Sequence, residues 1–421
     1  MKQGGLKKLT LRDVPLSGKT VLLRADYNVP LTKDGQIADD FRIRSSIDTI
    51  NYLVERHCKV VICSHLGRPN GKVNDAFTLE PVSTRLAKLL KKPIRFVPEC
   101  VGDQVSQATK RMRPGEVILL ENLRYHAGEE ADDVDFARLL ATSSNAEYFV
   151  QDGFGVVHRA HASTHAITQF LPSVSGLLLE REYNLIRSNM ENPKRPLVAI
   201  LGGAKVSDKI AVIEKFVSIA DTIVIGGAMA NTFLKQRGHD IGKSVHEDGL
   251  ESIVTKIYDT AQKKVGAENV DDFIVLPTDV AVATKIDLSV RRTVVAIEDV
   301  ASDEYILDAG SESIARIADI LDNAQTVIWN GTLGYAELEQ FSYGSARTAL
   351  ALATHPEITS VIGGGDTADF VLEWDAGSGS SFTHVSTGGG ASLDLMAGAA
   401  MPGIDALLDA QSAMQYTSEK H

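Results

Sequence analysis

The segment "DGFGVVHRAHAST" at residues 152–164 places His158, Arg159 and His161 within four residues, directly after an apolar run. Polar residues of similar chemistry follow other apolar runs in the first half of the chain, and Arg42 opens the first predicted helix. A guanidinium offers a fixed fork of donors that matches phosphate and carboxylate groups. Ligands of open parallel sheets bind beyond the carboxyl ends of the strands. The residues that we therefore expect to form an anion site are Asp26, Asn28, Arg42, His65, Arg68, Arg124 and Arg159.

Two other interpretations of these residues are weaker. Each arginine taken alone fits a surface ion pair as well as a ligand contact, but the shared position after strands argues against surface ion pairs for the set. His158, His161 and His165 suggest a metal cluster, yet Arg159 lies among them and no neighbouring carboxylate or cysteine completes a zinc set. The acidic run "GEEADDVD" at residues 128–135 is typical of a solvated helix start.

The second half of the chain carries glycines where the first half carries arginines. Glycine lets the backbone approach a ligand, and N–H groups at a helix start hold phosphate oxygens. Lys205 and Lys209 follow the first glycine pair at i and i+4, and so share one helix face. One such loop would be an ordinary tight turn, but five favour a phosphate-binding half. The glycines are Gly202, Gly203, Gly226, Gly227, Gly331, Gly334, Gly363, Gly364, Gly365, Gly388, Gly389 and Gly390.

An arginine-lined half and a glycine-lined half suggest two anionic ligands held across a cleft. Phosphoryl transfer between them is the economical hypothesis, because it needs positioning and charge neutralisation more than a side-chain nucleophile.

Two nucleotide motifs offer alternatives. "GGGDTA" at residues 363–368 fits the pattern GxGxxA after a strand, but the acidic residue expected about 20 positions further on is missing, which argues against an NAD-type dehydrogenase. "GHDIGKS" at residues 238–244 has three spacer residues where a P-loop requires four. A non-catalytic nucleotide-binding protein of the same fold stays open.

The elements that must position these residues alternate along the chain. Short β-branched runs such as "KVVICSH" and "PLVAILGG" alternate with amphipathic patterns such as "VDFARLLATSS". In "SDKIAVIEKFVSIAD" we expect a helix capped by Ser207, with Ile210, Ile213, Val217 and Ala220 on its apolar face. This alternation predicts an α/β fold of two Rossmann-like three-layer domains with mainly parallel sheets, joined by a helix across a cleft.

The joining helix lies in "GLLLEREYNLIRSNMENPKRP". Leu179, Tyr183, Ile186 and Met190 mark one of its faces, and prolines stop it. We expect a substrate domain over residues 1–180, the interdomain helix over 181–195 and a nucleotide domain over 196–402. Residues 403–421 are expected to pack back on the first domain.

The bulk properties limit the class of protein. The chain of 421 residues has a formal net charge of −12, which argues against nucleic-acid binding. Its three cysteines are an odd number without CxxC spacing, and this fits a reducing compartment. There is no apolar run for a signal peptide or a membrane span, so we expect a cytoplasmic protein.

Nine stretches resemble the phosphoglycerate kinase family, and they follow the family's order over essentially the whole chain. They are "RADYNVPL", "SHLGRP", "LLENLRYH", "DGFGVVHRAHAS", "LGGAKVSDKI", "IGGAMANTFL", "IWNGTLG", "GGGDTA" and "HVSTGGGASLDLMAG". The resemblance implies reversible transfer from 1,3-bisphosphoglycerate to Mg-ADP, giving 3-phosphoglycerate and ATP, in a monomer that closes its cleft to exclude water. It implies that the anion set binds the glycerate ligand, with Arg159 gripping its charge and His158 and His161 supporting the basic patch.

The resemblance also implies roles in the second half. Arg42, Lys205 and Lys209, aided by the helix starts at Gly365 and Gly388, would neutralise the transferring group. Asp366 would stand near Mg²⁺. The residues implied to bind the nucleotide are Lys205, Lys209, Gly310, Asn330, Glu337, Gly364, Gly365, Asp366 and Thr367. The chain departs from the family's usual pattern at Gln151, Gly153, Ser311 and Thr332, which we expect to affect nucleotide affinity and rate more than the class of reaction.

Overall fold

A computed structural model describes residues 5–410 and divides the chain into two compact units. The first unit runs to Asn184 and resumes at Ala399, and the second unit is Leu185–Gly398. Residues 399–410 pack on the first unit, where the Leu9 N–H donates to the Leu408 carbonyl at 2.7 Å. Residues 411–421 of the expected C-terminal segment lie outside the described residues. No described helix is long and apolar enough to cross a membrane.

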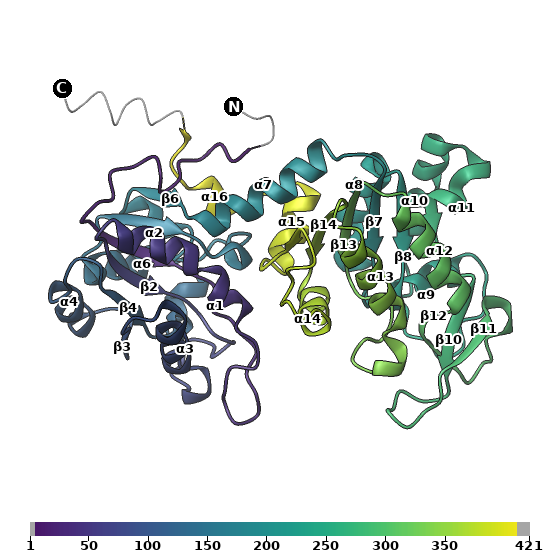
Figure 1. Cartoon of the computed structure of the whole chain (residues 1–421), viewed down its shortest axis with the longest axis horizontal. Coiled ribbons are helices and arrows are strands. Elements are labelled where there is room, and N and C mark those ends of the chain that lie inside the picture. Colours follow the sequence, from purple (N-terminus) through teal and green to yellow (C-terminus); the bar gives the residue numbers. More distant parts are fainter. Residues whose placement is uncertain (1–4, 411–421) are drawn as a thin grey trace. The chain divides into compact units, whose positions relative to one another are not determined.

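The first unit is built on a six-stranded parallel sheet in the order β3-β4-β2-β1-β5-β6 (Figure 1). The central strands are continuous apolar runs and are buried, as expected for a parallel sheet covered on both faces. The strands are β1 (Thr20–Arg24), β2 (Lys59–Cys63), β3 (Arg95–Val97), β4 (Val117–Leu120), β5 (Tyr148–Gln151) and β6 (Ser173–Ser175).

Alternate side chains of β1 point to two separate cores. Val21 and Leu23 pack with helices α2 and α3, whereas Leu22 packs with α4 and α6. The polar groups needed by the site are therefore displaced to the ends of the strands. The helices are α1 (Phe41–Ser45), α2 (Ile47–Glu55), α3 (Glu80–Leu90), α4 (Asp103–Lys110), α5 (Ala127–Glu130), α6 (Val134–Ser144) and α16 (Pro402–Asp405), with short 3₁₀ turns η1 (Asp75–Phe77), η2 (Leu123–Tyr125), η3 (Phe154–Val156) and η4 (Ala166–Gln169).

The second unit contains another six-stranded parallel sheet, in the order β15-β14-β13-β7-β8-β9. Its strands are β7 (Leu197–Leu201), β8 (Thr222–Ile225), β9 (Ile274–Val275), β13 (Thr326–Asn330), β14 (Thr359–Gly363) and β15 (His384–Val385). The α/β class with two parallel sheets is thus confirmed.

A three-stranded antiparallel sheet in the second unit was not predicted. Its order is β11-β10-β12, formed by β10 (Asp279–Ala283), β11 (Thr293–Ala296) and β12 (Tyr305–Ala309). Its small core includes Ala281, Leu307 and Phe341. The helices of this unit are α8 (Ile210–Ile219), α9 (Gly227–Gln236), α10 (Glu251–Val265), α11 (Val270–Phe273), α12 (Ser311–Asp322), α13 (Tyr343–Thr354), α14 (Gly365–Trp374) and α15 (Gly390–Ala397), with turns η5 (Ser207–Lys209), η6 (Ala267–Asn269), η7 (Ile297–Asp299) and η8 (Glu339–Phe341).

The division between the units falls inside helix α7 (Leu177–Glu191). The buried carboxylate of Asp152, which follows β5, accepts the N–H groups of Leu178 and Leu179 at 2.9 and 3.2 Å and so caps this helix. The expected interdomain helix over residues 181–195 and the other expected domain boundaries stay predictions.

One expected cap was wrong. Helix α8 begins at Ile210 with Lys209 at its N-cap position, and no side chain caps it. Ser207 lies earlier, in η5, where its hydroxyl donates to the Glu247 carboxylate at 2.5 Å. Ser207 thus bonds to the carboxylate of Glu247 instead of capping α8. Glu247 is distant in the sequence, so the local pattern of residues does not reveal this partner.

Candidate functional site

In the first unit, Asp26 organises the segment after β1. Its Oδ2 lies 2.9 Å from Nη1 of Arg42, and its Oδ1 accepts the Asn28 N–H at 3.1 Å. Burial alone would raise the pKa of Asp26, but Arg42, His65 and the Asn28 N–H lower it to about 2. The carboxylate is therefore ionised and holds Arg42, whose side chain is 25% exposed and open to a ligand.

His65 lies beside the same carboxylate and is held by a second arginine. Its Nδ1 is 4.0 Å from Asp26 and 3.3 Å from Nη2 of Arg24. Burial lowers the pKa of His65 well below its ordinary value; Asp26 opposes this, and Arg24, Arg124 and Arg42 add to it. The ring is neutral, and because Arg24 donates to Nδ1 its proton is on Nε2. Arginine rather than imidazolium supplies the positive charge here.

Arg24 is completely buried and belongs to a network that the sequence did not indicate. Its Nε donates to the Ser163 hydroxyl at 2.8 Å, and its guanidinium lies 3.8 Å from Glu129. Glu129 also accepts the Ser163 hydroxyl and N–H, at 2.6 and 3.0 Å. This network fixes the loop that follows Arg159.

We expected residues 128–135 to form a solvated helix start. This prediction is wrong for Glu129, which is fully buried. Burial raises its pKa, while Arg24 and Ser163 lower it. Asp132 of the same run accepts from His165, at 2.6 Å from its Nδ1. His161 is also buried, and burial together with Arg24 and Arg124 lowers its pKa to about 4, so it supports the patch without adding charge.

Gly67 connects Asn28 to another arginine of the set. Its N–H donates to Oδ1 of Asn28 at 2.8 Å, and its carbonyl accepts from Nη1 of Arg124, also at 2.8 Å. Burial lowers the pKa of Arg124, as do the charges of Arg24 and Arg159, with Glu130 opposing them. Arg159 is exposed, and its Nε donates to Nε2 of His158 at 3.0 Å.

Arg68 differs from the rest of the set. It is exposed and makes no ion pair with any of the residues from 5 to 410. Contacts through Asp26 and Gly67 thus join five of the seven predicted residues, which are Asp26, Asn28, Arg42, His65 and Arg124. Arg159 acts on Arg124 through its charge, and Arg68 is connected to the set only as the chain neighbour of Gly67.

In the second unit, glycine loops at the ends of β7, β8 and β13 pack directly on one another. A side chain at Gly202 would meet the Thr332 carbonyl at 2.1 Å, and Gly331 has φ +103°. The Gly331 N–H donates to the Thr367 hydroxyl at 2.6 Å. These glycines are therefore needed for loop packing, whether or not a phosphate is bound.

The N-terminus of α14 is different, because its surroundings are open. Gly364 at its N-cap has φ +91°, and a side chain placed at Gly365 would meet nothing within 4 Å. Asp366 is exposed at this end of the helix. Nδ2 of Asn330 has no hydrogen-bond partner among the described residues, although the atom is buried. This ten-residue helix offers N–H groups to an anion.

Lys209 lies nearby and is tied to the backbone. Its Nζ donates to the carbonyls of Gly202 and Asn330, at 2.6 and 3.1 Å. Burial lowers its pKa to about 8, and Asp366 and Asp208 oppose this shift. Lys205 is exposed, so only one of the two lysines is held by the loops in this structure.

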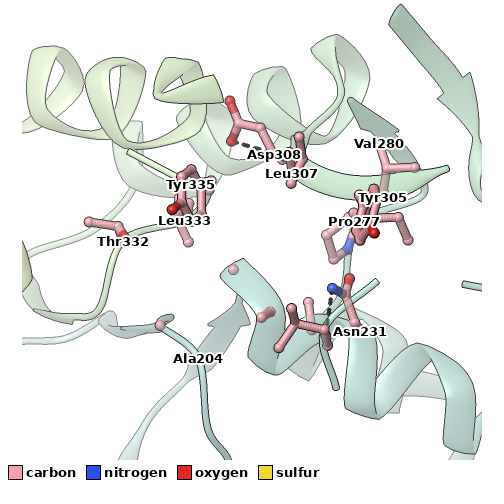
Figure 2. Close-up of a pocket in the computed structure, with 18 of the residues that line it drawn as sticks. Ala204, Asn231, Pro277, Val280, Tyr305, Leu307, Asp308, Thr332, Leu333 and Tyr335 are labelled. Carbon is pink, nitrogen blue, oxygen red and sulfur yellow. Dashed lines mark hydrogen bonds between the residues drawn. The ribbon is translucent and has the colours of Figure 1, made fainter. Parts of the chain in front are cut away.

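A pocket of about 170 Å³ lies beside these loops (Figure 2). Leu234, Val245, Pro277, Val280 and Leu307 give it apolar walls, and Figure 2 shows Tyr305 and Tyr335 from two different segments around it. Glu337 and Asp366 also line it. An apolar pocket next to an open helix N-terminus can hold a flat base together with its phosphates.

Asn231 and Asp308 are the buried polar residues of this pocket that the sequence did not indicate. Nδ2 of Asn231 donates to the Val245 carbonyl at 3.0 Å, so its amide orientation is fixed, and its Oδ1 has no partner among the described residues. Asp308 accepts the N–H groups of Ala309 and Gly344. Burial raises the pKa of Asp308 to about 7, although these bonds and Arg292 lower it.

Comparisons with known proteins agree with this arrangement. The family model described as "Phosphoglycerate kinase" matches residues 11–399. This chain belongs to the phosphoglycerate kinase family. The chain is 42% identical over 404 residues to the phosphoglycerate kinase of Pelotomaculum thermopropionicum, covering 96% of this chain and 100% of that protein. It is 44% identical over 405 residues to that of Microcystis aeruginosa, covering 95% and 98%.

Solved structures of the family share the fold. The phosphoglycerate kinase of Coxiella burnetii matches with a TM-score of 0.81 and 35% identity, over 97% of this chain and 99% of that one. That of Pyrococcus horikoshii matches with the same TM-score and 29% identity, over the same shares. The resemblance is confirmed, the chain is a kinase, and neither the dehydrogenase nor the non-catalytic alternative is supported.

One glycine that the resemblance placed at a helix start needs correction. Gly388 lies before the N-cap Gly389 of α15, which begins at Gly390. Gly310, which the resemblance implies to bind the nucleotide, is the N-cap of α12, where the Asp279 carboxylate accepts the N–H groups of Glu312 and Ser313, at 3.0 and 2.8 Å. That helix start is therefore capped from within the protein.

Proposed function

We propose that the chain catalyses reversible phosphoryl transfer from 1,3-bisphosphoglycerate to Mg-ADP, giving 3-phosphoglycerate and ATP. The observation that carries this proposal is Arg42, which is fixed by Asp26 and partly open, in a chain that belongs to the phosphoglycerate kinase family. A guanidinium in that position suits the carboxylate and phosphate groups of a phosphoglycerate.

For the glycerate ligand, we assign binding to Asp26, Asn28, Arg42, His65, Arg68, Arg124 and Arg159. Asp26 and Asn28 have a positioning role, since Asp26 contacts Arg42 and Asn28 accepts the Gly67 N–H. Arg124 is held by the Gly67 carbonyl and by Glu130 at 3.2 Å, which directs its guanidinium.

For the nucleotide, we assign the base to the apolar pocket and the phosphates to the start of α14. Glu337 lines the pocket, and Gly364, Gly365 and Thr367 belong to the open helix start. Lys205, Lys209 and Asn330 stand at the adjoining loops. The free acceptor of Asn231 suits the amino group that adenine carries at C6, where guanine carries a carbonyl oxygen, and this favours adenine over guanine.

A Mg²⁺ ion fits this donor set. Asp366 offers an exposed carboxylate that makes no ion pair within residues 5–410, and Mg²⁺ prefers one or two carboxylates together with phosphates and waters. When bound, the ion would neutralise charge on the nucleotide phosphates.

The chemistry needs no general base. In the direction that consumes ATP, a carboxylate oxygen of 3-phosphoglycerate forms a bond to the γ-phosphorus, while the bond from that phosphorus to the bridging oxygen breaks and its electron pair leaves with ADP. The carboxylate is already ionised at neutral pH. Arg42, Lys205, Lys209 and the N–H groups around Gly365 and Gly388 would stabilise the charge of the transferring group.

We also propose that the enzyme works as a cytoplasmic monomer that binds neither nucleic acid nor membranes. Its three cysteines, Cys58, Cys63 and Cys100, are all free and buried, as suits a reducing compartment.

The test is ADP formation from ATP by the purified full-length chain, with and without 3-phosphoglycerate and Mg²⁺. We expect ADP formation that requires both additions. Hydrolysis of ATP that ignores 3-phosphoglycerate, or no turnover at all, would contradict the proposal.

A further inference from the structure

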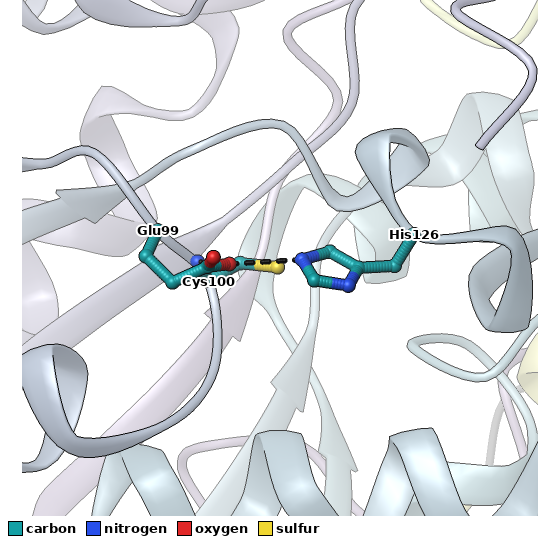
Figure 3. Close-up of side chains that lie close together, drawn as sticks. All are labelled: Glu99, Cys100 and His126. Atoms are coloured by element: carbon teal, nitrogen blue, oxygen red, sulfur yellow. Dashed lines mark hydrogen bonds and ion pairs between the residues drawn. The ribbon is translucent and has the colours of Figure 1, made fainter. Parts of the chain in front are cut away.

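A separate cluster of side chains that can bind a metal lies in the first unit. Its residues have no role in the proposed phosphoryl-transfer site. Glu99, Cys100 and His126 each offer one ligand atom, and the three atoms lie within 4.8 Å of one another. Nε2 of His126 is 2.8 Å from Oε1 of Glu99. Figure 3 shows the Cys100 sulfur beside this contact, with the imidazole approaching from the opposite side of the cluster.

The backbone and a neighbouring ring hold these ligands in place. Glu99 and Cys100 follow β3, and Oε1 of Glu99 accepts the Cys100 N–H at 2.7 Å. His126 directly follows η2, and its ring stacks on Phe136 with centroids 5.1 Å apart and planes 26° apart. The stacking restrains the imidazole, which points Nε2 rather than Nδ1 at the other two ligands.

The cluster is closed on one side and open on the other. Cys100 is fully buried, whereas the side chains of Glu99 and His126 are 38% and 33% exposed. An ion can therefore enter from the solvent side and keep a water as a further ligand. One thiolate and one carboxylate would balance the two charges of a divalent ion, with a neutral imidazole as the third ligand.

We propose that Glu99, Cys100 and His126 bind a single divalent ion of the zinc class. Sulfur, imidazole nitrogen and carboxylate oxygen together suit Zn²⁺ or Co²⁺, whereas Mg²⁺ and Ca²⁺ require oxygen ligands. On binding, the Cys100 S–H bond breaks, its electron pair goes to the metal and the proton goes to solvent. The Nε2 proton that His126 shares with Glu99 is lost to solvent, and the neutral ring carries its one proton on Nδ1, so that Nε2 can donate its lone pair to the metal. No electrons are transferred to or from the ion.

The proposal is tested by titrating Co²⁺ into the metal-free full-length protein and recording its absorption. A thiolate ligand gives a charge-transfer band in the near ultraviolet, and we expect one saturable site per chain, with the band removed by added Zn²⁺. Cys100→Ser should abolish the band. His126→Asn should weaken Co²⁺ binding by at least about tenfold, since even the partners of metal ligands typically cost that much.

Cys58→Ser is the matched control. Cys58 is also a buried thiol, but its sulfur bonds to the Leu16 carbonyl at 3.1 Å and lies outside the cluster, so this variant should keep the band. Because Cys100→Ser can fail to fold, His126→Asn at the half-exposed position also decides. Added Zn²⁺ should raise the Tm of the wild type and not that of His126→Asn. The proposal is overturned if the wild type shows no saturable thiolate band, or if His126→Asn retains wild-type affinity.

Discussion

Oδ2 of Asp26 lies 2.9 Å from Nη1 of Arg42, with Asp26 buried and Arg42 partly exposed. The buried carboxylate thus fixes an arginine that is open to a ligand. Because it also accepts the Asn28 N–H, one residue orients two members of the proposed glycerate site.

We predict that Asp26→Asn raises the KM for 3-phosphoglycerate by about 10- to 100-fold, because losing a charged hydrogen bond costs about 1.5–3 kcal/mol. The pKa of Asp26 in the folded protein, about 2, is below its ordinary value of 3.8. The carboxylate therefore contributes a stabilisation of about 2 kcal/mol that is present above pH 3.8 and is lost as the pH falls toward 2. Urea unfolding should show the gap in stability between wild type and variant shrinking from pH 7 to pH 3. A gap that is independent of pH would contradict this assignment.

The Glu129 network predicts a large loss of stability on truncation. Glu129→Ala leaves Arg24 buried beside Ser163 without its carboxylate, and breaking a buried pair in this way costs about 3–5 kcal/mol. Glu129→Gln keeps the shape and one acceptor oxygen, and should cost less. Asp135→Asn, on an 81% exposed side chain of the same acidic run, is the control and should leave unfolding by urea unchanged. Equal effects of Glu129→Ala and Asp135→Asn would refute the network.

The raised pKa of Asp308 predicts that its contribution to stability changes with pH in the direction opposite to that of Asp26. The pKa of Asp308 in the folded protein, about 7, is above its ordinary value of 3.8, so the native state binds the proton more tightly than the unfolded state. This contribution to stability is lost as the pH rises from 3.8 to about 7. Asp308→Asn cannot titrate, so its stability relative to the wild type should increase between pH 5 and pH 8, by a few kcal/mol at most. Exposed Asp303→Asn should show no such change, and a flat difference for Asp308→Asn would disprove the assignment.

The free acceptor of Asn231 predicts a preference among nucleotides. Asn231→Leu has a similar volume but lacks the acceptor, so we expect kcat/KM for ATP to fall by about 2- to 12-fold, the value of one neutral hydrogen bond, while that for GTP changes little. Tyr335→Phe alters a polar group of the same pocket and should leave the ratio of ATP to GTP unchanged. If Asn231→Leu also leaves this ratio unchanged, Asn231 does not read the base.

Much of the fold could be predicted, because its signals are local. The apolar pattern of "VDFARLLATSS" gives α6 (Val134–Ser144), and Asp133 caps it through the Phe136 N–H at 2.7 Å. The glycine runs likewise marked the ends of the strands. Polar residues after strands marked most of the proposed glycerate site, since parallel strands bring their carboxyl ends to one edge.

What could not be predicted depends on long-range partners. Glu129 looks solvated in a run of acidic residues, and its contacts with Arg24 and with Ser163, 34 positions away, explain its burial. Arg24 lies in the sequence pattern of a strand, and that pattern does not show which residue pairs with its guanidinium. The antiparallel sheet of β10, β11 and β12 was not predicted for a similar reason, because its central strand β10 pairs with β12, which is not the next strand along the chain.

The most direct test of the central claim compares Arg42→Ala with Arg44→Ala in the Mg²⁺-dependent formation of ADP from ATP and 3-phosphoglycerate. Arg44 is two residues away and pairs with Asp40 at 2.7 Å, so it controls for a lost guanidinium on the same short helix. The account predicts that Arg42→Ala lowers kcat by about 10²- to 10³-fold, as for the loss of a donor to transition-state charge, while Arg44→Ala retains near wild-type kcat. Equal rates for Arg42→Ala and the wild type would contradict it.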